Sequence, residues 1–369
     1  PMDVAVKDAK IARVAANIND EASLVVDASG MYIVPGIIDM HTHNYHGNLG
    51  TYLANGFSSV QPDGFTFRSG VTTVVDVGSS GWRNFEQFKS QTIDKSKTRV
   101  LAFLNIVGTG MKGGAWEQDL IDMDGRLTAA TANQFPGTVV GIKVAHYFGP
   151  EWEPVDRGVE AGTIADIPVM IDFGGHEPPL SLETLLIEKL RPGDILTHAF
   201  AHVDRRIPIV NQQGKVEPFV WQAQERGIIF DVGHGGGSFR FDQAVPAMEQ
   251  GFRPNTISTD LHTGSMNGGM KDMSNVMSKF LNMGMNMQQV IEASTWKPAQ
   301  VIKRPDLGHL SEGALADIAV FTIREGNFGF IDVQKKKMEG TRKLECELTI
   351  REGSVVYDLN GIASPIWNE

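Results

Sequence analysis

The sequence contains a single cysteine, Cys346, among its 369 residues. An intramolecular disulfide is therefore excluded, and any zinc site in this chain must use histidine, aspartate or glutamate ligands. Basic residues are in the minority, 33 against 44 acidic ones, which gives a net charge of −11. This charge argues against nucleic acids and anionic membrane surfaces as partners. Apolar runs are also too short to span a membrane.

No signal peptide is visible, and together with the lone cysteine this leads us to expect a cytoplasmic location. The first residues, 1–6, resemble the middle of a strand, so we expect the natural protein to have residues before Pro1. Hydrophobic residues make up 41% of the chain and charged residues 21%, which is an ordinary composition for a soluble globular protein.

Eight strand-like runs with helix-length segments between them predict a (β/α)8 barrel of the α/β class. Their ranges are 34–43, 72–78, 99–107, 138–144, 168–173, 194–198, 227–232 and 255–260. In such a barrel the active site lies at the carboxyl ends of the strands. Residues 1–32 and 311–369 are β-rich with glycine turns. We expect these two ends to pair into one small β-sandwich beside a barrel that spans residues 33–310.

The run His41-Thr42-His43 follows an apolar stretch that is typical of a buried strand. Residues two apart on a strand point the same way, so both imidazoles are expected on one side. Two neutral imidazoles at a strand end form half of a site for a divalent metal. Taken alone, the pair is equally well explained as two surface histidines in a turn.

Four further strands are predicted to end in residues that suit a metal site. Lys143 ends the fourth strand, Asp172 the fifth, His198 the sixth and Asp260 the eighth. Each has a structural explanation by itself, for example Asp260 as a helix cap and Lys143 as a buried ion-pair partner. Because the strand ends of a barrel converge on one point, five such ends together favour a metal site.

Lys143 needs its own explanation, because a protonated lysine is no metal ligand and its ammonium would be repelled by divalent cations. Reaction of the amine with carbon dioxide would give a carbamate, an anion whose two oxygens can bridge two metals. This chemistry would account for a lysine in an apolar strand.

These motifs resemble those of the amidohydrolase superfamily, in its dihydroorotase-like and deacetylase-like branch. The resemblance rests on residues 34–43, 70–76, 141–143, 197–198, 258–260, 295–299 and 313–318. It covers nearly the whole chain, and the motifs occur in the expected order. It implies a metal-bearing (β/α)8 barrel together with a β-sandwich built from both termini.

The resemblance also implies a role for each matching residue. His41, His43 and Asp260 would hold the more buried of two metal ions, carboxylated Lys143 would bridge the pair, and His198 would bind the second ion. Asp260 would be the catalytic base and acid, which moves a proton from the attacking water to the leaving group. Two zinc ions per chain are expected, with manganese or iron as alternatives.

One position departs from the family pattern, because the fifth strand ends in Asp172 where the family usually has a histidine. A carboxylate can ligate zinc, so we favour Asp172 as the substitute ligand. His176 and His146 are alternative replacements, and a weak or absent second metal is a further alternative.

Loops that follow the strands are expected to contact the substrate. The glycine-rich run 233–239 offers backbone amides that could bind a carboxylate or carbonyl oxygen. Arg83, after the second strand, could pair with a substrate carboxylate. The candidate substrate-binding residues are Arg83, His146, His176, His234, Gly235 and His262.

The leading hypothesis is a metal-dependent hydrolase that cleaves an amide, or an ester, with metal-activated hydroxide. The expected substrates are small N-acyl or O-acyl compounds that carry a carboxylate, which would make the enzyme an amidohydrolase acting on C–N bonds other than peptide bonds. Cyclic amides of the dihydroorotate or hydantoin type are the alternative. The rival from another class is a non-catalytic scaffold that assembles as a homo-oligomer, which the five ligand-type strand ends disfavour.

Overall fold

A computed structural model describes residues 2–47, 56, 58–203 and 205–367 of the chain. In this part of the chain, parallel strands form a curved sheet of seven in the order β10-β9-β8-β7-β6-β5-β4. The strands are β4 (Ile37–Thr42), β5 (Val71–Gly81), β6 (Arg99–Asn105), β7 (Val139–Val144), β8 (Val169–Ile171), β9 (Ile195–Leu196) and β10 (Ile229–Phe230).

The segment 255–261 closes the barrel between the last strand and the first. On one side Asp231 pairs in parallel with Thr256, and on the other Thr42 pairs in parallel with Leu261. The predicted eighth strand is therefore present as an extended segment joined by isolated bridges, and not as a regular strand. With this segment in place, the barrel predicted from the sequence is confirmed.

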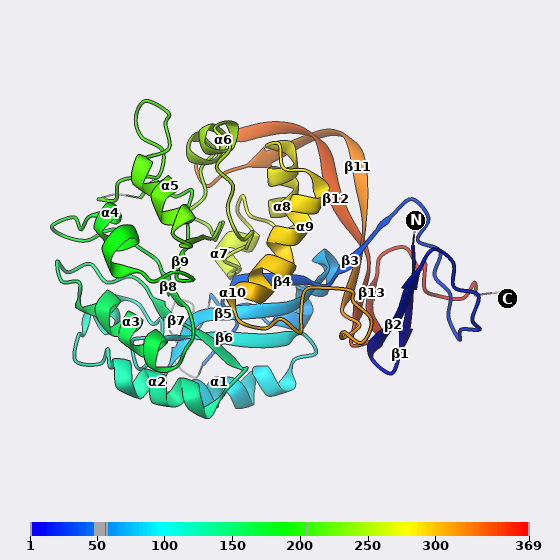
Figure 1. The fold of residues 1–369 in the computed structure, drawn as a ribbon, viewed down its shortest axis with the longest axis horizontal. Helices are drawn as coiled ribbons and strands as arrows, with labels where there is room; N and C mark the ends of the chain where they lie inside the picture. The colour runs from blue at the N-terminus through cyan, green and yellow to red at the C-terminus, as the bar shows by residue number, and fades with distance from the viewer. Residues whose placement is uncertain (1, 48–55, 57, 204, 368–369) are drawn as a thin grey trace.

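Helices surround the barrel, and Figure 1 shows α1, α2 and α3 along one edge of it, with α8 and α9 on the side that faces the small domain. The helices are α1 (Phe85–Gln91), α2 (Gly125–Gln134), α3 (Glu153–Ile164), α4 (Leu182–Thr184), α5 (Pro218–Glu225), α6 (Phe241–Glu249), α7 (Thr263–Met266), α8 (Met273–Asn282), α9 (Met287–Ser294) and α10 (Trp296–Val301). A π-helical turn, Leu185–Lys189, follows α4, and short 3-10 helices lie at Pro62–Gly64, Phe67–Ser69, Ile93–Lys95 and Gly114–Gln118.

Apolar side chains pack on both faces of the sheet, because successive residues of a strand point to opposite sides. Val74 faces outward and belongs to the cluster that includes Phe88 of α1. Its neighbour Val75 faces inward and belongs to a second cluster, which also contains Phe103 and Ile302. The interior of the barrel is thus filled, and the strand ends above it are left for polar residues.

Both ends of the chain form a small β domain beside the barrel, and Figure 1 shows the N and C termini close together there. β1 (Asp3–Lys7) and β2 (Lys10–Ala15) form a hairpin, and β3 (Tyr32–Pro35), β11 (Ile318–Ile331), β12 (Lys337–Arg351) and β13 (Ser354–Asp358) form an antiparallel sheet in the order β13-β12-β11-β3. Ile11 shares one buried cluster with Ile318 and Leu348, so the two ends have a common core.

The strand expected over residues 34–43 is divided at Gly36, which corrects the sequence prediction. Pro35 pairs with Ile318 in the small sheet, whereas Ile37 pairs with Val71 in the barrel. A Cβ at Gly36 would lie 2.2 Å from the hydroxyl oxygen of Thr72, so only glycine lets the chain pass this point. One continuous apolar run therefore serves both domains.

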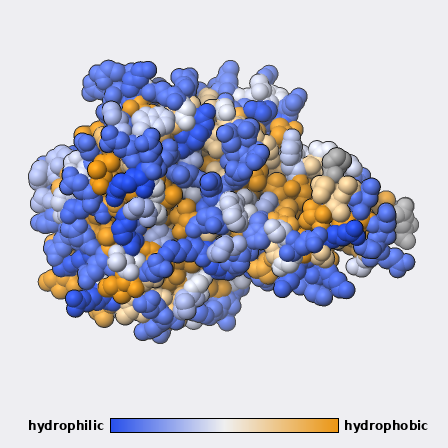
Figure 2. Space-filling model, viewed as in Figure 1, coloured by the Kyte–Doolittle hydropathy of each residue, from blue (hydrophilic) through white to orange (hydrophobic). Residues whose placement is uncertain are grey.

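The β11–β12 hairpin is long and extends from the small domain over α8 (Figure 1). Lys279 of α8 donates to the carbonyl oxygen of Ile331 at 2.8 Å, and Asn282 donates to that of Arg342 at 2.6 Å. The face in Figure 2 is mostly hydrophilic, with scattered hydrophobic patches. Among the described helices, none has the length and apolar character needed to cross a membrane.

Candidate active site

His41 and His43 lie at the carboxyl end of β4, and both side chains are buried. Nδ1 of His41 lies 2.8 Å from Oγ1 of Thr197, and Nδ1 of His43 lies 3.1 Å from Oγ of Ser79. The Nε2 atoms lie 3.7 Å (His41) and 3.0 Å (His43) from Oδ1 of Asp260. The two imidazoles therefore face the same carboxylate, each held from behind by a hydroxyl group.

His198 supplies a third imidazole and follows directly after Thr197 at the end of β9. Its Nδ1 lies 2.6 Å from the carbonyl oxygen of Gly233. His198 and Asp260 both have left-handed backbones, with φ of 54° and 51°, a conformation that is uncommon for residues with a side chain. One ligand atom from each of His41, His198 and Asp260 lies within 4.8 Å of the others. Strand ends that are distant in sequence are thus brought to one buried point.

Hydrogen bonding decides which nitrogen of these imidazoles carries the proton. A carbonyl oxygen can only accept, so Nδ1 of His198 must donate to Gly233. Thr197 donates its hydroxyl to Asp231 at 2.8 Å, so it accepts from Nδ1 of His41. The Nε2 lone pairs are therefore left for a cation, and holding the second nitrogen in this way is the usual support of a metal-binding histidine.

Burial largely determines the charges in this cluster. Burial, followed by the charge of Lys143, lowers the pKa of His41 to about 3, so this imidazole is neutral at neutral pH. Burial by itself would raise the pKa of Asp260, but His41 and His43 hold it below its usual value. Imidazole nitrogens and an ionised carboxylate are a donor set that divalent cations prefer. The residues present therefore fit a divalent metal.

Lys143 is the penultimate residue of β7 and is almost fully buried. In the described part of the chain its Nζ contacts Sδ of Met170 at 3.6 Å. Burial lowers the pKa of the amine, against the opposing influence of nearby carboxylates led by Asp172. A Cβ at Gly78 would lie 2.7 Å from Cγ of Lys143, so glycine makes room for the stem of the lysine. A lowered pKa favours the neutral amine, which is the form that reacts with carbon dioxide.

Asp172 follows β8 and lies between two imidazoles. Its Oδ2 is 3.4 Å from Nε2 of His146 and 3.5 Å from Nε2 of His198. Nδ1 of His146 in turn lies 2.9 Å from Oε2 of the buried Glu117. The structure thus brings Asp172 and His146 to the edge of the histidine cluster, where the family pattern has a histidine at the end of the fifth strand.

His176 is buried, but its ring packs on Phe173, with centroids 4.6 Å apart. Its Nδ1 has no hydrogen-bond partner among the described residues. His176 lines a small hollow together with Asp172, Tyr147 and Glu151. It therefore lies beside the cluster, in the same hollow as Asp172 and with its ring against Phe173.

The loop after β10 contributes to the site through its backbone. The amides of His234 and Gly235 donate to the carbonyl oxygens of Ser258 and Thr259 at 3.3 and 2.9 Å, which helps to close the barrel. These two amides are therefore already engaged, contrary to the expectation that they bind substrate. The ring of His234 turns away from the histidine cluster, since its Nε2 lies 2.6 Å from Nζ of Lys279.

Two further candidates for substrate binding lie farther out. His262 caps the amino terminus of α7 and accepts from the amide of Gly264 at 3.1 Å, with its ring 6.4 Å from that of His43. Arg83 is half-exposed and pairs with Asp122 at 2.7 Å, while its guanidinium stacks over the adjacent tryptophan. His262 therefore borders the cluster, whereas Arg83 is engaged by neighbours.

Sequence reasoning missed the residues that support the histidines. Asp231 accepts from Thr197 and Ser258 and thereby holds the partner of His41. It lies one residue before the end of the seventh predicted strand, so the rule that strand ends carry ligand-type residues could have found it. Glu117, which holds His146, lies in the 3-10 helix after β6 and carries no such signal.

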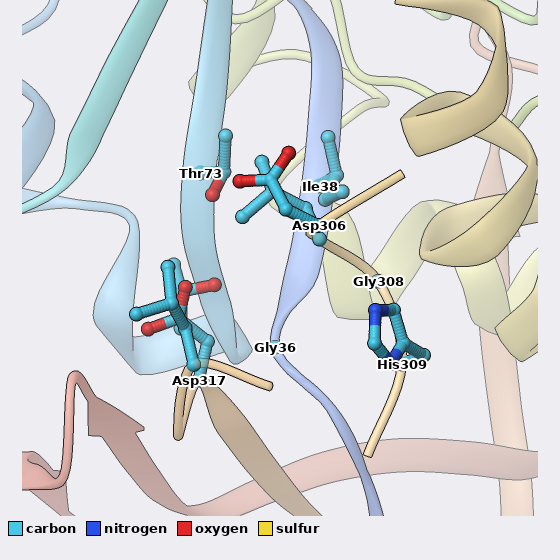
Figure 3. A pocket seen from close by; sticks show the side chains of 10 residues that line it. Gly36, Ile38, Thr73, Asp306, Gly308, His309 and Asp317 are labelled. Carbon is cyan, nitrogen blue, oxygen red and sulfur yellow. The ribbon is translucent and has the colours of Figure 1, made fainter. Parts of the chain in front are cut away.

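A separate hollow lies at the other end of the barrel, between β4, β5 and the small domain (Figure 3). It is lined by Gly36, Ile38, Thr72, Thr73, Asp306, Leu307, Gly308, His309, Leu315 and Asp317. Gly36 lies before the first residue of β4, so this hollow is at the amino ends of the strands. Catalytic residues of such barrels lie at the opposite end, which is where the histidine cluster is found.

Known proteins resemble this chain over most of its length. Residues 241–356 match the model of the amidohydrolase family. A deacetylase from Brucella anthropi is 36% identical over 336 residues, which covers 88% of this chain and 80% of that protein. A deacetylase from Enterococcus faecalis is 31% identical over 334 residues, which covers 88% of this chain and 86% of that protein.

Two solved structures share the fold. The crystal structure of an adenine deaminase superposes with a TM-score of 0.88 at 29% identity, and it covers 97% of this chain and 96% of its own. The crystal structure of a dihydroorotase superposes with a TM-score of 0.84 at 31% identity, and it covers 97% of this chain and 95% of its own. The family match, the relatives and the shared barrel agree with the buried histidine cluster, and the chain therefore belongs to the amidohydrolase superfamily, in its deacetylase-like and dihydroorotase-like branch.

Proposed function

We propose that this protein is a metal-dependent deacylase that hydrolyses the amide, or ester, bond of a small N-acyl or O-acyl substrate carrying a carboxylate. The observation that carries the proposal is the convergence of His41, His198 and Asp260, whose ligand atoms lie within 4.8 Å of one another in a buried site. The deacetylases from two bacteria, at 36% and 31% identity, support acyl transfer to water as the reaction.

The metal site that we propose holds two ions. His41, His43 and Asp260 would hold one of them, His198 and Asp172 the other, and Lys143, as a carbamate, would join the two. Imidazole and carboxylate ligands favour zinc. When bound, a divalent ion lowers the pKa of a water molecule and polarises the scissile carbonyl group.

Asp260 is the residue that we propose as base and acid. Its Oδ1 lies 3.0 Å from Nε2 of His43. A Cβ at Gly235 would lie 2.3 Å from its Oδ2, so the carboxylate packs closely against the loop after β10. Its lowered pKa keeps it ionised and able to accept a proton from the attacking water. The same carboxylate then delivers that proton to the departing nitrogen, or to the departing oxygen of an ester.

A cyclic amide of the dihydroorotate or hydantoin type is the second candidate substrate. The dihydroorotase that shares the fold at 31% identity favours it. Opening of a cyclic amide and removal of an N-acyl group both break an amide C–N bond, so the residues named above would serve both reactions. The size and charge of the accepted substrate distinguish the two candidates.

The test combines metal analysis with a substrate screen. Protein purified without chelator or nickel affinity should contain about two zinc equivalents and should hydrolyse at least one N-acyl amino acid faster than any cyclic amide. Higher rates with dihydroorotate or hydantoins would move the assignment to a cyclic amidase. Absence of bound metal, after addition of zinc and bicarbonate, would contradict the proposal and favour a non-catalytic scaffold.

A further inference from the structure

We propose that His146 is a ligand of the second metal ion, in place of the histidine that the family usually has at the end of the fifth strand, and that Glu117 positions it. The inference rests on the proposed two-ion site and names the residue that completes it. Asp172 occupies the fifth strand end and provides one oxygen ligand. The missing nitrogen ligand would then come from the fourth strand, three residues after Lys143.

The first argument is the spacing of the three candidate ligands. Nε2 of His146 lies 3.4 Å and Nε2 of His198 lies 3.5 Å from the same Oδ2 of Asp172. These distances exceed the usual N–H···O range of about 2.7–3.2 Å. Two atoms that each lie about 2.1 Å from one tetrahedral zinc are about 3.4 Å apart. The separations therefore match those expected for neighbouring ligands of one metal.

The second argument is that His146 is supported in the same way as the other histidines. Oε2 of Glu117 lies 2.9 Å from Nδ1 of His146. The corresponding Nδ1 contacts are 2.8 Å for His41 with Oγ1 of Thr197 and 2.6 Å for His198 with the carbonyl oxygen of Gly233. Glu117 is only 1% exposed. A buried carboxylate behind an imidazole fixes the ring and directs the other nitrogen into the site.

The backbone of His146 is also held in an unusual conformation. Its φ is 57°, a left-handed conformation that is unfavourable for a residue with a side chain. Gln118 stabilises the turn, since its amide donates to the carbonyl oxygen of His146 at 2.6 Å and its own oxygen accepts from the amide of Phe148 at 2.9 Å. Glu117 and Gln118 therefore hold the side chain and the backbone of the same histidine.

His176 is the rival for this role and lacks these features. It lies four residues after Asp172, but its ring packs on Phe173 and its Nδ1 has no partner among the described residues. A loop histidine with an unsupported ring would lose more freedom on binding a metal than the supported His146. His176 is thus the matched control: a buried histidine near the site that the inference excludes as a ligand.

The experiment counts metal ions and measures their affinity in four variants: His146→Asn, Glu117→Ala, Glu117→Gln and His176→Asn. Zinc per chain is measured by elemental analysis, and affinity by titration of the metal-free protein with cobalt(II), whose visible spectrum reports the ligands. We expect wild-type protein and His176→Asn to hold two ions, and His146→Asn to hold one. Glu117→Ala should lower the affinity for the second ion about 10- to 100-fold, which is the usual effect of removing a group that supports a metal ligand.

Glu117→Gln separates positioning from a general loss of structure, because its amide oxygen can still accept from His146. It should retain a second-ion affinity closer to wild type than Glu117→Ala does. If His146→Asn binds two ions with wild-type affinity and an unchanged cobalt spectrum, the inference is wrong while the proposed function stands. If wild-type protein binds only one ion, the inference and the two-ion site are overturned while metal-dependent hydrolysis stands. If it binds none, the proposed function is overturned as well.

Discussion

Gly235 allows a quantitative test of how the loop after β10 positions Asp260. The φ of Gly235 is 57°, and an added Cβ would lie 2.3 Å from Oδ2 of Asp260, whereas ordinary contact begins at 3.4 Å. In a Gly235→Ala variant the carboxylate or the loop must therefore move by about 1 Å, and a displacement of that size can cost a catalytic group about 100-fold in rate. The left-handed backbone adds a stability cost of about 1–2 kcal/mol.

Two control variants separate the backbone cost from the clash. Gly214 has a φ of 73° and nothing within 4 Å of an added Cβ, so Gly214→Ala carries the backbone cost alone. Gly237 lies in the same loop as Gly235 and also has open space around it, so Gly237→Ala should resemble wild type. We expect kcat/KM to fall about 100-fold in Gly235→Ala only, and the free energy of unfolding to fall by about 1–2 kcal/mol in both Gly235→Ala and Gly214→Ala.

The assay is hydrolysis of the best N-acyl amino acid from the screen, followed at several substrate concentrations, with urea unfolding and zinc content measured on the same preparations. Equal kcat/KM for Gly235→Ala and Gly214→Ala would refute the reasoning, because a displaced Asp260 could then not be important for turnover. A loss in Gly235→Ala that is explained entirely by lower zinc content would place the effect on metal binding and not on the proton transfer.

Three further predictions follow from the same contacts. Asp260→Asn should lower kcat by at least about 100-fold, since it removes the proposed general base, while circular dichroism stays unchanged; full activity would contradict the mechanism. Lys143→Met cannot form a carbamate, so it should bind fewer than two zinc ions and should not respond to added bicarbonate, as elemental analysis with and without bicarbonate will measure. Burial lowers the pKa of Lys279, beside His234, to about 7. Between pH 7 and the usual lysine pKa of 10.5 the unfolded chain binds more protons than the folded one, so the free energy of unfolding should rise with pH. This rise should be absent in Lys279→Met, and a parallel pH dependence of the two proteins in urea unfolding would count against it.

Much of the fold was accessible from the sequence because apolar runs and ligand-type strand ends recur together. The barrel and the small β domain follow from that pattern. The regularity of individual strands does not, since β9 and β10 contain two paired residues each and the segment 255–261 has isolated bridges. Hydropathy records which residues are buried, but backbone pairing depends on the neighbouring strand. The division at Gly36 was missed for the same reason, because both parts of the run are apolar.

The positions of side chains in the candidate site could also be predicted only in part from the sequence. His41, His198 and Asp260 could be found because each ends a predicted strand. Glu117 could not be found, because its partner His146 is 29 residues away in sequence and only the folded chain brings them together. His234 illustrates the opposite error, since its glycine-rich loop suggested a substrate contact while its ring lies between Phe239 and Lys279. A strand end predicts the direction of a side chain, and a loop does not.

The seam between β4 and the closing segment 255–261 shows how an irregular element can hold Asp260 in place. Thr259 donates its amide to Oδ1 of Asp39 at 3.0 Å, and its hydroxyl donates to the other oxygen of the same carboxylate. Asp39 lies two residues before His41, and Thr259 directly precedes Asp260. Because the seam has isolated backbone bridges, this buried carboxylate supplies the connection that a longer strand ladder would otherwise provide. The relative position of His41 and Asp260 therefore depends on the side chain of Asp39, which lies outside the proposed ligand set.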